Sequence, residues 1–318
     1  METRRLGTNG PDISVIGYGA WEAGGGYYGE NPPDHEMIAA MRAAFDAGVN
    51  WVDTAEAYGA GRSEELVGAA IDGYDDALVA TKVVMRPFGS GLDAAGIRAG
   101  ADASRRRLGR DVLDLYQLHL PDPSVPVEES WEAMARLVDD GVARHIGLSN
   151  FPLEFVQRCE RLRHVDAVQL HLSLLHRDDY RELHPFCEEN GIAILAYGPL
   201  GFGVLTGTMT TETRFPENDW RSGGVPVPVP LYEQIFAPGA FERHLASVDA
   251  LRPVAERNAL TLAQLALAWV VAQPGVTAAI VGSRSATRMR ENAAAGSVEL
   301  TGVQLEEIDA TLGARLSR

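Results

Sequence analysis

Polar residues follow three apolar runs in the first half of the chain. Asp53 ends the run WVD, and Tyr58 follows it within a short polar segment. Lys82 closes the run ALVAT, and His119 closes the run LDLYQL. If each run is a strand of one parallel barrel, these side chains converge on the rim at the carboxyl ends of the strands. Together, an Asp, a Tyr, a Lys and a His suit proton delivery to a carbonyl oxygen without a metal.

Each side chain of this set would have a definite task. A Tyr hydroxyl has a pKa of about 10 in water, so alone it is a weak acid. We expect the Lys82 ammonium to stabilise the Tyr58 phenolate and lower its pKa. Asp53 can hold Lys82 through a charge-assisted hydrogen bond. His119 can then donate to the carbonyl oxygen and orient it.

Each of these residues also has an ordinary explanation when it is taken alone. An Asp after a strand is often a helix cap, and a Lys is usually solvated. A buried His is more often a core residue than a catalyst, and a Tyr can be a loop aromatic. Their joint occurrence after consecutive strands favours the chemical interpretation.

Short β-rich runs alternate with helical patterns along nearly the whole chain, which predicts an α/β fold of the (β/α)8 TIM-barrel type. The expected strands are 16–19, 50–53, 78–81, 113–118, 145–148, 167–169, 193–196 and 278–281. The expected helices are 34–48, 63–72, 93–108, 128–140, 153–162, 180–190, 261–273 and 286–295. The alternative is an open doubly wound sheet, but no G-x-G-x-x-G follows the first strand.

Additional elements are expected around the barrel. Residues 4–6 and 13–15 predict an N-terminal β-hairpin with a turn at GTNG. Asp34 is expected to N-cap its helix, and Gly48 to end it. Residues 201–238 are rich in Gly, Pro and Thr and predict a functional loop over the barrel mouth. C-terminal extra helices are expected near 240–257 and 303–316, and residues 1–318 are expected to form a single domain.

Composition excludes several classes of function. The formal net charge is −16 and no run of Lys and Arg is long, so nucleic-acid binding is not expected. No apolar stretch reaches membrane-spanning length, and the first residues lack the apolar core of a signal peptide. A cytoplasmic location is therefore expected, with Cys159 and Cys187 as structural thiols. The sequence assigns no oligomeric state.

Several motifs in order resemble one known family. They are RLG at 5–7, DTAEAYG at 53–59, ATK at 80–82, DLYQLH at 114–119, IGLSN at 146–150, VQ at 168–169, LAYGPLG at 195–201 and GSR at 282–284. On these motifs the chain is similar to the aldo-keto reductase superfamily over essentially its full length. The resemblance implies the catalytic tetrad Asp53, Tyr58, Lys82 and His119. Relatives that reduce steroid carbon–carbon double bonds carry Glu in place of His119, so the resemblance implies a carbonyl reductase.

The resemblance also implies that the cofactor is NADP(H). Ser149, Asn150 and Gln169 match the groups that bind the nicotinamide carboxamide, and Tyr197 matches the aromatic on which the nicotinamide stacks. Arg284 and Arg288 match the clamp on the 2′-phosphate. The remaining implied cofactor contacts are Ala20, Trp21, Asp53, Gly198, Pro199, Leu200, Gly201, Gly282, Ser283, Glu291 and Asn292. Two departures stand out: His171 and Leu172 replace a frequent Glu-Tyr pair, and Thr208 replaces a frequent Lys.

The expected function is NADPH-dependent reduction of an aldehyde or ketone, with a small carbonyl compound or alcohol as the partner. Trp21, Tyr58 and His119 are the expected substrate contacts. Apolar walls are also expected from Tyr27, Tyr28, Met85, Phe88 and Trp220, which would favour aromatic or medium-chain aldehydes over sugars. One alternative is an NADP(H)-binding regulatory subunit with little turnover. Another is a metal-dependent hydrolase using Asp53 and His119, but no metal site is expected because clustered ligands are lacking.

Overall fold

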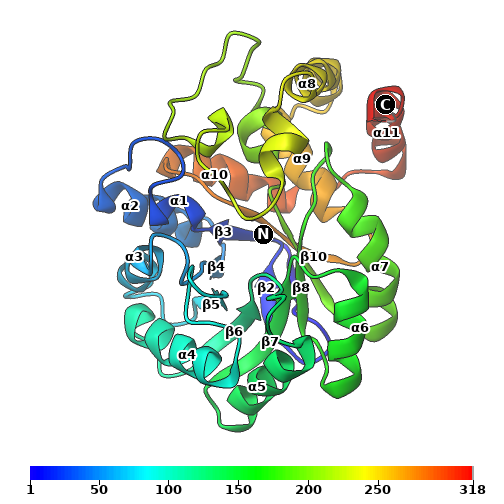
Figure 1. Ribbon diagram of the computed structural model, residues 1–318. Helices are drawn as coiled ribbons and strands as arrows, with labels where there is room; N and C mark the ends of the chain where they lie inside the picture. The colour runs from blue at the N-terminus through cyan, green and yellow to red at the C-terminus, as the bar shows by residue number, and fades with distance from the viewer. Residues whose placement is uncertain (317–318) are drawn as a thin grey trace.

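Eight parallel strands close into a barrel in the computed structural model, which describes residues 1–316 (Figure 1). Their order around the barrel is β3, β4, β5, β6, β7, β8, β9 and β10, and β10 pairs with β3 to close it. The strands are β3 (Ile16–Gly19), β4 (Trp51–Asp53), β5 (Leu78–Val83), β6 (Leu113–Leu118), β7 (Ala143–Ser149), β8 (Ala167–His171), β9 (Ala193–Tyr197) and β10 (Val276–Val281). The predicted (β/α)8 barrel is confirmed.

Helices form the outer ring of the barrel (Figure 1). They are α1 (Trp21–Gly24), α2 (Asp34–Asp46), α3 (Arg62–Ala70), α4 (Ala94–Leu108), α5 (Val127–Asp139), α6 (Leu153–Leu162), α7 (Asp178–Asn190), α8 (Ala240–Arg257), α9 (Leu262–Val271), α10 (Ala286–Ala294) and α11 (Gly302–Leu316). The expected N-cap at Asp34 is wrong. Pro33 is the N-cap, while Asp34 lies in the first turn and pairs with Arg62.

Small apolar side chains fill the barrel interior. Ala80, Ala167, Ala193 and Ala278 surround the buried indole of Trp51. Gly17 leaves room for that indole, because a Cβ at position 17 would lie 2.3 Å from its ring. These side chains fill the half of the barrel away from the strand carboxyl ends. The barrel therefore encloses a packed core and not a pore.

The N-terminal hairpin packs against the same interior. It consists of β1 (Thr3–Arg5) and β2 (Asp12–Ser14), which pair antiparallel. Leu6 and Ile13 contact the interior cluster. The predicted hairpin is confirmed and covers the end of the barrel away from the strand carboxyl ends.

The segment 201–238 contains three short helical turns: η1 (Gly201–Thr206), η2 (Trp220–Ser222) and η3 (Tyr232–Phe236). It meets the loop after α1, where Trp220 N donates to Tyr27 O at 2.8 Å. Tyr28 and Asp219 form an isolated antiparallel bridge beside this bond. Two loops that are far apart in the sequence are thus joined over the barrel mouth.

No helix among the described residues is long and apolar enough to cross a membrane.

Candidate active site

Strand periodicity places the polar groups in one layer above the apolar interior. Side chains two positions apart in a strand lie on the same face. Asp53 therefore follows Trp51, Lys82 follows Ala80 and Gln169 follows Ala167, always one layer closer to the carboxyl end. Asp53 and Lys82 of the predicted tetrad lie in this layer, and Tyr58 and His119 lie next to it in the loops that follow β4 and β6.

Asp53 and Lys82 form a buried ion pair. Lys82 Nζ donates to Asp53 Oδ1 at 2.6 Å and to Thr54 O at 2.9 Å. Gln169 Nε2 donates to the other carboxylate oxygen, Asp53 Oδ2, at 2.8 Å. Burial lowers the pKa of the Lys82 ammonium, and Asp53 opposes that effect. The pair is held by hydrogen bonds on both partners, which a buried ion pair requires.

Tyr58 and His119 face each other across the bottom of a cavity. Their ring centroids are 5.6 Å apart at an interplanar angle of 78°. Lys82 Nζ lies 5.2 Å from the centroid of the Tyr58 ring. Burial, followed by the charge of Lys82, lowers the pKa of His119 well below its ordinary value, so its imidazole is neutral. A neutral imidazole can still donate one hydrogen bond.

The expectation that Lys82 lowers the pKa of Tyr58 is wrong for this structure. Burial raises the pKa of Tyr58 well above its ordinary value, and the Asp53 carboxylate raises it further. The Lys82 ammonium is hydrogen-bonded to the Asp53 carboxylate, and the negative charge of that carboxylate disfavours a phenolate at Tyr58. Tyr58 is consequently held as a phenol, the form that can give a proton.

A second group of polar side chains lies on the opposite side of the cavity. Tyr197 OH donates to Asn150 Oδ1 at 2.7 Å. Asn150 Nδ2 donates to His119 O at 3.2 Å and to Ser149 Oγ at 3.0 Å. This network orients the Tyr197 ring at the cavity wall.

His171 supports Tyr197 from behind. It is buried, and its ring stacks on Tyr197 with centroids 5.3 Å apart and on His176 with centroids 4.3 Å apart. Burial, and then His176, lower the pKa of His171 well below its ordinary value. Gly198 allows this close packing, since a Cβ there would lie 2.9 Å from His171 Cδ2. The departure noted at His171 is thus a packing support for Tyr197.

The cavity has a volume of about 600 Å³ and runs from Tyr58 and His119 toward the start of α10. Most of the predicted cofactor residues line it: Trp21, Asp53, Ser149, Asn150, Gln169, Tyr197, Gly198, Pro199, Leu200, Gly282, Ser283, Arg284, Arg288, Glu291 and Asn292. Ala20 and Gly201 do not. Ala20 is buried with its N–H bonded to Asp53 O, and Gly201 turns the chain into η1.

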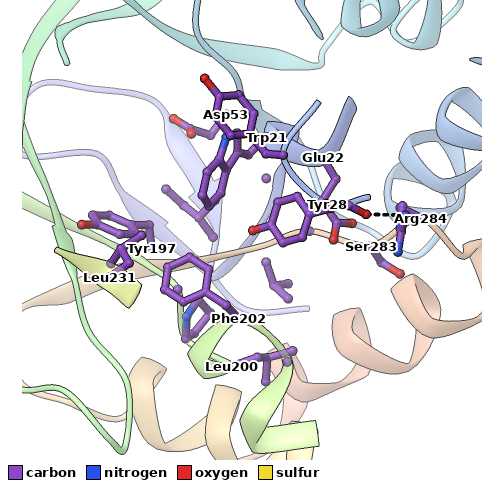
Figure 2. Close-up of a pocket in the computed structure, with 18 of the residues that line it drawn as sticks. Trp21, Glu22, Tyr28, Asp53, Tyr197, Leu200, Phe202, Leu231, Ser283 and Arg284 are labelled. Carbon is purple, nitrogen blue, oxygen red and sulfur yellow. Dashed lines mark hydrogen bonds between the residues drawn. The ribbon is translucent and has the colours of Figure 1, made fainter. Parts of the chain in front are cut away.

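The far end of the cavity suits an anion. Ser285 N-caps α10, whose first turn presents backbone N–H groups. Arg284 donates to Glu30 O at 3.2 Å, and Figure 2 shows it beside Tyr28 and Ser283. Arg288 is exposed and, among the described residues, its guanidinium makes no hydrogen bond or ion pair. A guanidinium with open donors at a helix start fits a phosphate.

Aromatic rings surround Trp21 at the mouth. Ring contacts join it to Tyr27, Tyr28, Tyr58, Phe202 and Trp220, and Figure 2 shows the rings of Trp21, Tyr28 and Phe202 around the cavity. The expected walls from Met85, Phe88 and Trp220 are wrong. None of the three lines the cavity: Trp220 is fully buried beneath it, and Phe88 is 66% exposed.

Residues that the sequence did not indicate also line the cavity. They include Glu22, Phe202, Thr206, Met209, Arg221, Val227, Pro228, Val229 and Leu231, together with Leu120 beside His119. Thr208, the other departure, lines it as well. Adjacency to a predicted site residue gave a signal for Glu22, which follows Trp21, and for Leu120, which follows His119. The others belong to loops whose position depends on distant contacts.

No group of three or more His, Cys, Asp or Glu side chains in the described part of the chain is arranged to hold a metal ion. The buried Nδ1 of His119 has no hydrogen-bond partner among the described residues, and its ring faces Tyr58. The site therefore combines a buried phenol, a neutral imidazole and an aromatic ring at the cavity wall with an end that suits an anion.

Comparison with known proteins defines the family. A model described as the Aldo/keto reductase family matches residues 15–312. The chain is 35% identical over 292 residues to the aldo-keto reductase YhdN of Bacillus subtilis, covering 89% of this chain and 85% of that protein. The chain belongs to the aldo/keto reductase family.

Solved structures agree with this assignment. The glycerol dehydrogenase AKR11B4 from Gluconobacter oxydans superposes with a TM-score of 0.87 at 30% identity, covering 99% of this chain and 96% of that one. An aldo/keto reductase from Klebsiella pneumoniae in complex with NADP and acetate superposes with a TM-score of 0.72 at 28% identity, covering 96% and 95%.

Proposed function

We propose that this protein reduces an aldehyde or a ketone to an alcohol with NADPH, and that Tyr58 gives the proton. The observation that carries the proposal is the meeting of Tyr58 and His119 at the cavity bottom, 5.6 Å apart between ring centroids, above the Asp53–Lys82 pair. NADPH, when bound, supplies a hydride to the carbonyl carbon. The remaining steps fall to the side chains of this chain.

The protein would position the carbonyl group and deliver the proton. Neutral His119 would donate to the carbonyl oxygen and hold it beside the Tyr58 hydroxyl. Tyr58 would then pass its proton to that oxygen as negative charge develops there. Lys82 lies 5.2 Å from the Tyr58 ring centroid, close enough for its charge to stabilise the phenolate that remains.

The cofactor would lie along the length of the cavity. Tyr197 would stack on the nicotinamide, and Ser149, Asn150 and Gln169 would bind its carboxamide. Gln169 Nε2 already donates to Asp53, so its Oε1 is the atom directed to the cofactor amide. Arg284 and Arg288 would bind the 2′-phosphate at the start of α10.

The substrate end of the cavity favours apolar compounds. Trp21, Tyr27 and Leu120 line it, and Val227, Pro228 and Val229 come from the long loop. Such walls reward apolar burial by about 25 cal/mol per Å². They offer few partners for the hydroxyls of a sugar. We therefore propose aromatic or medium-chain aldehydes, although the structural relative from Gluconobacter oxydans acts on glycerol.

The test is a panel of carbonyl substrates with NADPH oxidation followed optically. We expect turnover with substituted benzaldehydes, unchanged by a metal chelator. Binding of NADPH without turnover of any aldehyde or ketone would instead support the regulatory-subunit alternative. Loss of turnover on chelation would point to the metal-dependent alternative.

A further inference from the structure

Glu22 places a carboxyl group in the wall of the cofactor cavity. It lies in α1 directly after Trp21 and lines the same cavity as Ser283, Arg284 and Arg288. Figure 2 shows it beside Tyr28, on the side of the cavity where Arg284 lies. Among the described residues, its side chain makes no hydrogen bond and no ion pair.

The charged groups around Glu22 are engaged elsewhere. Arg221 Nη2 donates to Asp219 Oδ2 at 2.6 Å, so this cation is already paired with a carboxylate other than Glu22. Arg284 donates to the carbonyls of Tyr28 and Glu30. The other titratable groups that face Glu22 are Arg288 and the phenols of Tyr18 and Tyr28.

This setting disfavours a negative charge on Glu22. Burial raises the pKa of the Glu22 carboxyl, and Asp219 raises it further, while Arg284, Arg221 and Arg288 oppose the rise. Tyr18 and Tyr28 are also buried phenols whose pKa is raised, so neither adds a counter-charge.

Cofactor phosphates would shift the balance further toward a neutral carboxyl. They bring negative charge into the cavity that Glu22 lines. They would also occupy Arg284 and Arg288, two of the cations that oppose the rise. A carboxylate and a phosphate that share a partly buried wall repel each other.

We propose that bound NADP(H) favours the protonated form of the Glu22 carboxyl, so that cofactor binding takes up a proton. This inference rests on the cofactor placement proposed above. Binding then raises the pKa of Glu22 above its value in the free protein. Affinity is highest below the free-protein pKa, where Glu22 is neutral in both states. It falls as pH rises through the window between the two pKa values, and is constant above it.

The test is a titration of wild type, Glu22→Gln and Glu36→Gln with NADPH and with NADH. Glu36 lies exposed in α2, so its variant changes the net charge equally at a distance from the cavity. We expect the wild-type Kd to rise with pH by up to about tenfold per pH unit within the window, because one proton is linked. Glu22→Gln should lack this rise and bind about tenfold more tightly at the alkaline end.

Titrations with NADH distinguish the protonation of Glu22 from the protonation of the cofactor's own 2′-phosphate. The 2′-phosphate of NADPH has a second pKa of about 6, and NADH lacks this group. A pH dependence from that phosphate would persist in Glu22→Gln and vanish with NADH. A dependence from Glu22 would appear with both cofactors and vanish in Glu22→Gln.

Calorimetry of the wild type provides a readout that needs no variant. Uptake of up to one proton per cofactor, measured in buffers of different ionisation enthalpy, is the expected result. No proton uptake, or a pH profile that Glu22→Gln leaves unchanged, would overturn the inference. Weaker binding by Glu22→Gln at every pH would overturn it too, since the carboxylate would then be a hydrogen-bond acceptor for the cofactor. Failure of the wild type to bind NADPH would instead contradict the proposed function.

Discussion

Tyr58 is the residue on which the proposed reaction depends. Its surroundings keep the hydroxyl protonated, because burial and the nearby Asp53 carboxylate both disfavour the phenolate. Lys82 Nζ lies 5.2 Å from the centroid of the Tyr58 ring. The proton can therefore leave only when negative charge develops on an adjacent substrate oxygen.

Replacing Tyr58 with Phe removes the hydroxyl and keeps the ring. Because general-acid catalysis typically contributes about 10²–10⁴-fold, we expect kcat for carbonyl reduction to fall by that order. NADPH affinity, measured by fluorescence titration, should be nearly unchanged. If Tyr58→Phe kept more than about half of the wild-type kcat, the hydroxyl would not supply this rate enhancement. Tyr58 would then be ruled out as the proton donor.

Arg284 and Arg288 decide the expected cofactor preference. Each guanidinium can make charge-assisted hydrogen bonds to a 2′-phosphate, worth about 1.5–3 kcal/mol apiece. Replacing both with Ala should weaken NADPH binding by several kcal/mol and spare NADH. Arg290→Ala is the matched control, because Arg290 is exposed on the same helix and does not line the cavity. Equal loss of affinity for NADPH and NADH would show that Arg284 and Arg288 do not bind the 2′-phosphate.

Among the structural elements, the loop after α1 and the segment 201–238 are joined over the barrel mouth. Arg221 links them: it pairs with Asp219 and lies over the rings of Tyr28 and Phe215, at 5.1 Å and 4.5 Å from their centroids. Tyr28 belongs to the first loop and Phe215 to the long loop. This contact holds the segment 201–238 against the cavity it helps to line.

Asp219→Asn should loosen this junction. Asp219 is buried, and the change removes the negative partner of Arg221 while keeping the side-chain shape. Loss of a hydrogen bond to a charged group costs about 1–3 kcal/mol. We expect faster amide exchange in 201–238 and faster NADPH release in stopped-flow measurements. Glu212→Gln, at an exposed position of the same loop, should alter neither; unchanged release from Asp219→Asn would mean that the junction does not retain the cofactor.

For the whole molecule, barrel and loops together decide the substrate. The cavity wall combines apolar side chains from Trp21 after β3, Leu120 after β6 and Val227–Val229 of the long loop. We expect kcat/KM to be higher for a substituted benzaldehyde than for an aldose or glyceraldehyde. The physical reason is uncompensated desolvation of sugar hydroxyls against apolar walls. A clear preference for the polar aldehydes would show that polar groups bind the substrate.

The barrel and the convergence of Asp53 and Lys82 could be predicted from sequence because both depend on local regularity. Strand alternation sets which side chains face inward, and Asp53, Lys82 and Gln169 each stand two positions after an interior apolar residue. The carboxyl ends of parallel strands meet at one rim, so residues far apart in the chain converge there. No knowledge of the loops is needed for that step.

Only the tertiary structure decided the role of the loops and the charge states. Phe88 points to solvent and Trp220 is buried, although both sit in loops near the mouth. Glu22 faces the cofactor cavity, and the pKa of Tyr58 is raised where Lys82 was expected to lower it. Loop positions and pKa shifts depend on which distant groups come together and on how completely they exclude water. Neither the loop positions nor the pKa shifts can be predicted from the local sequence pattern.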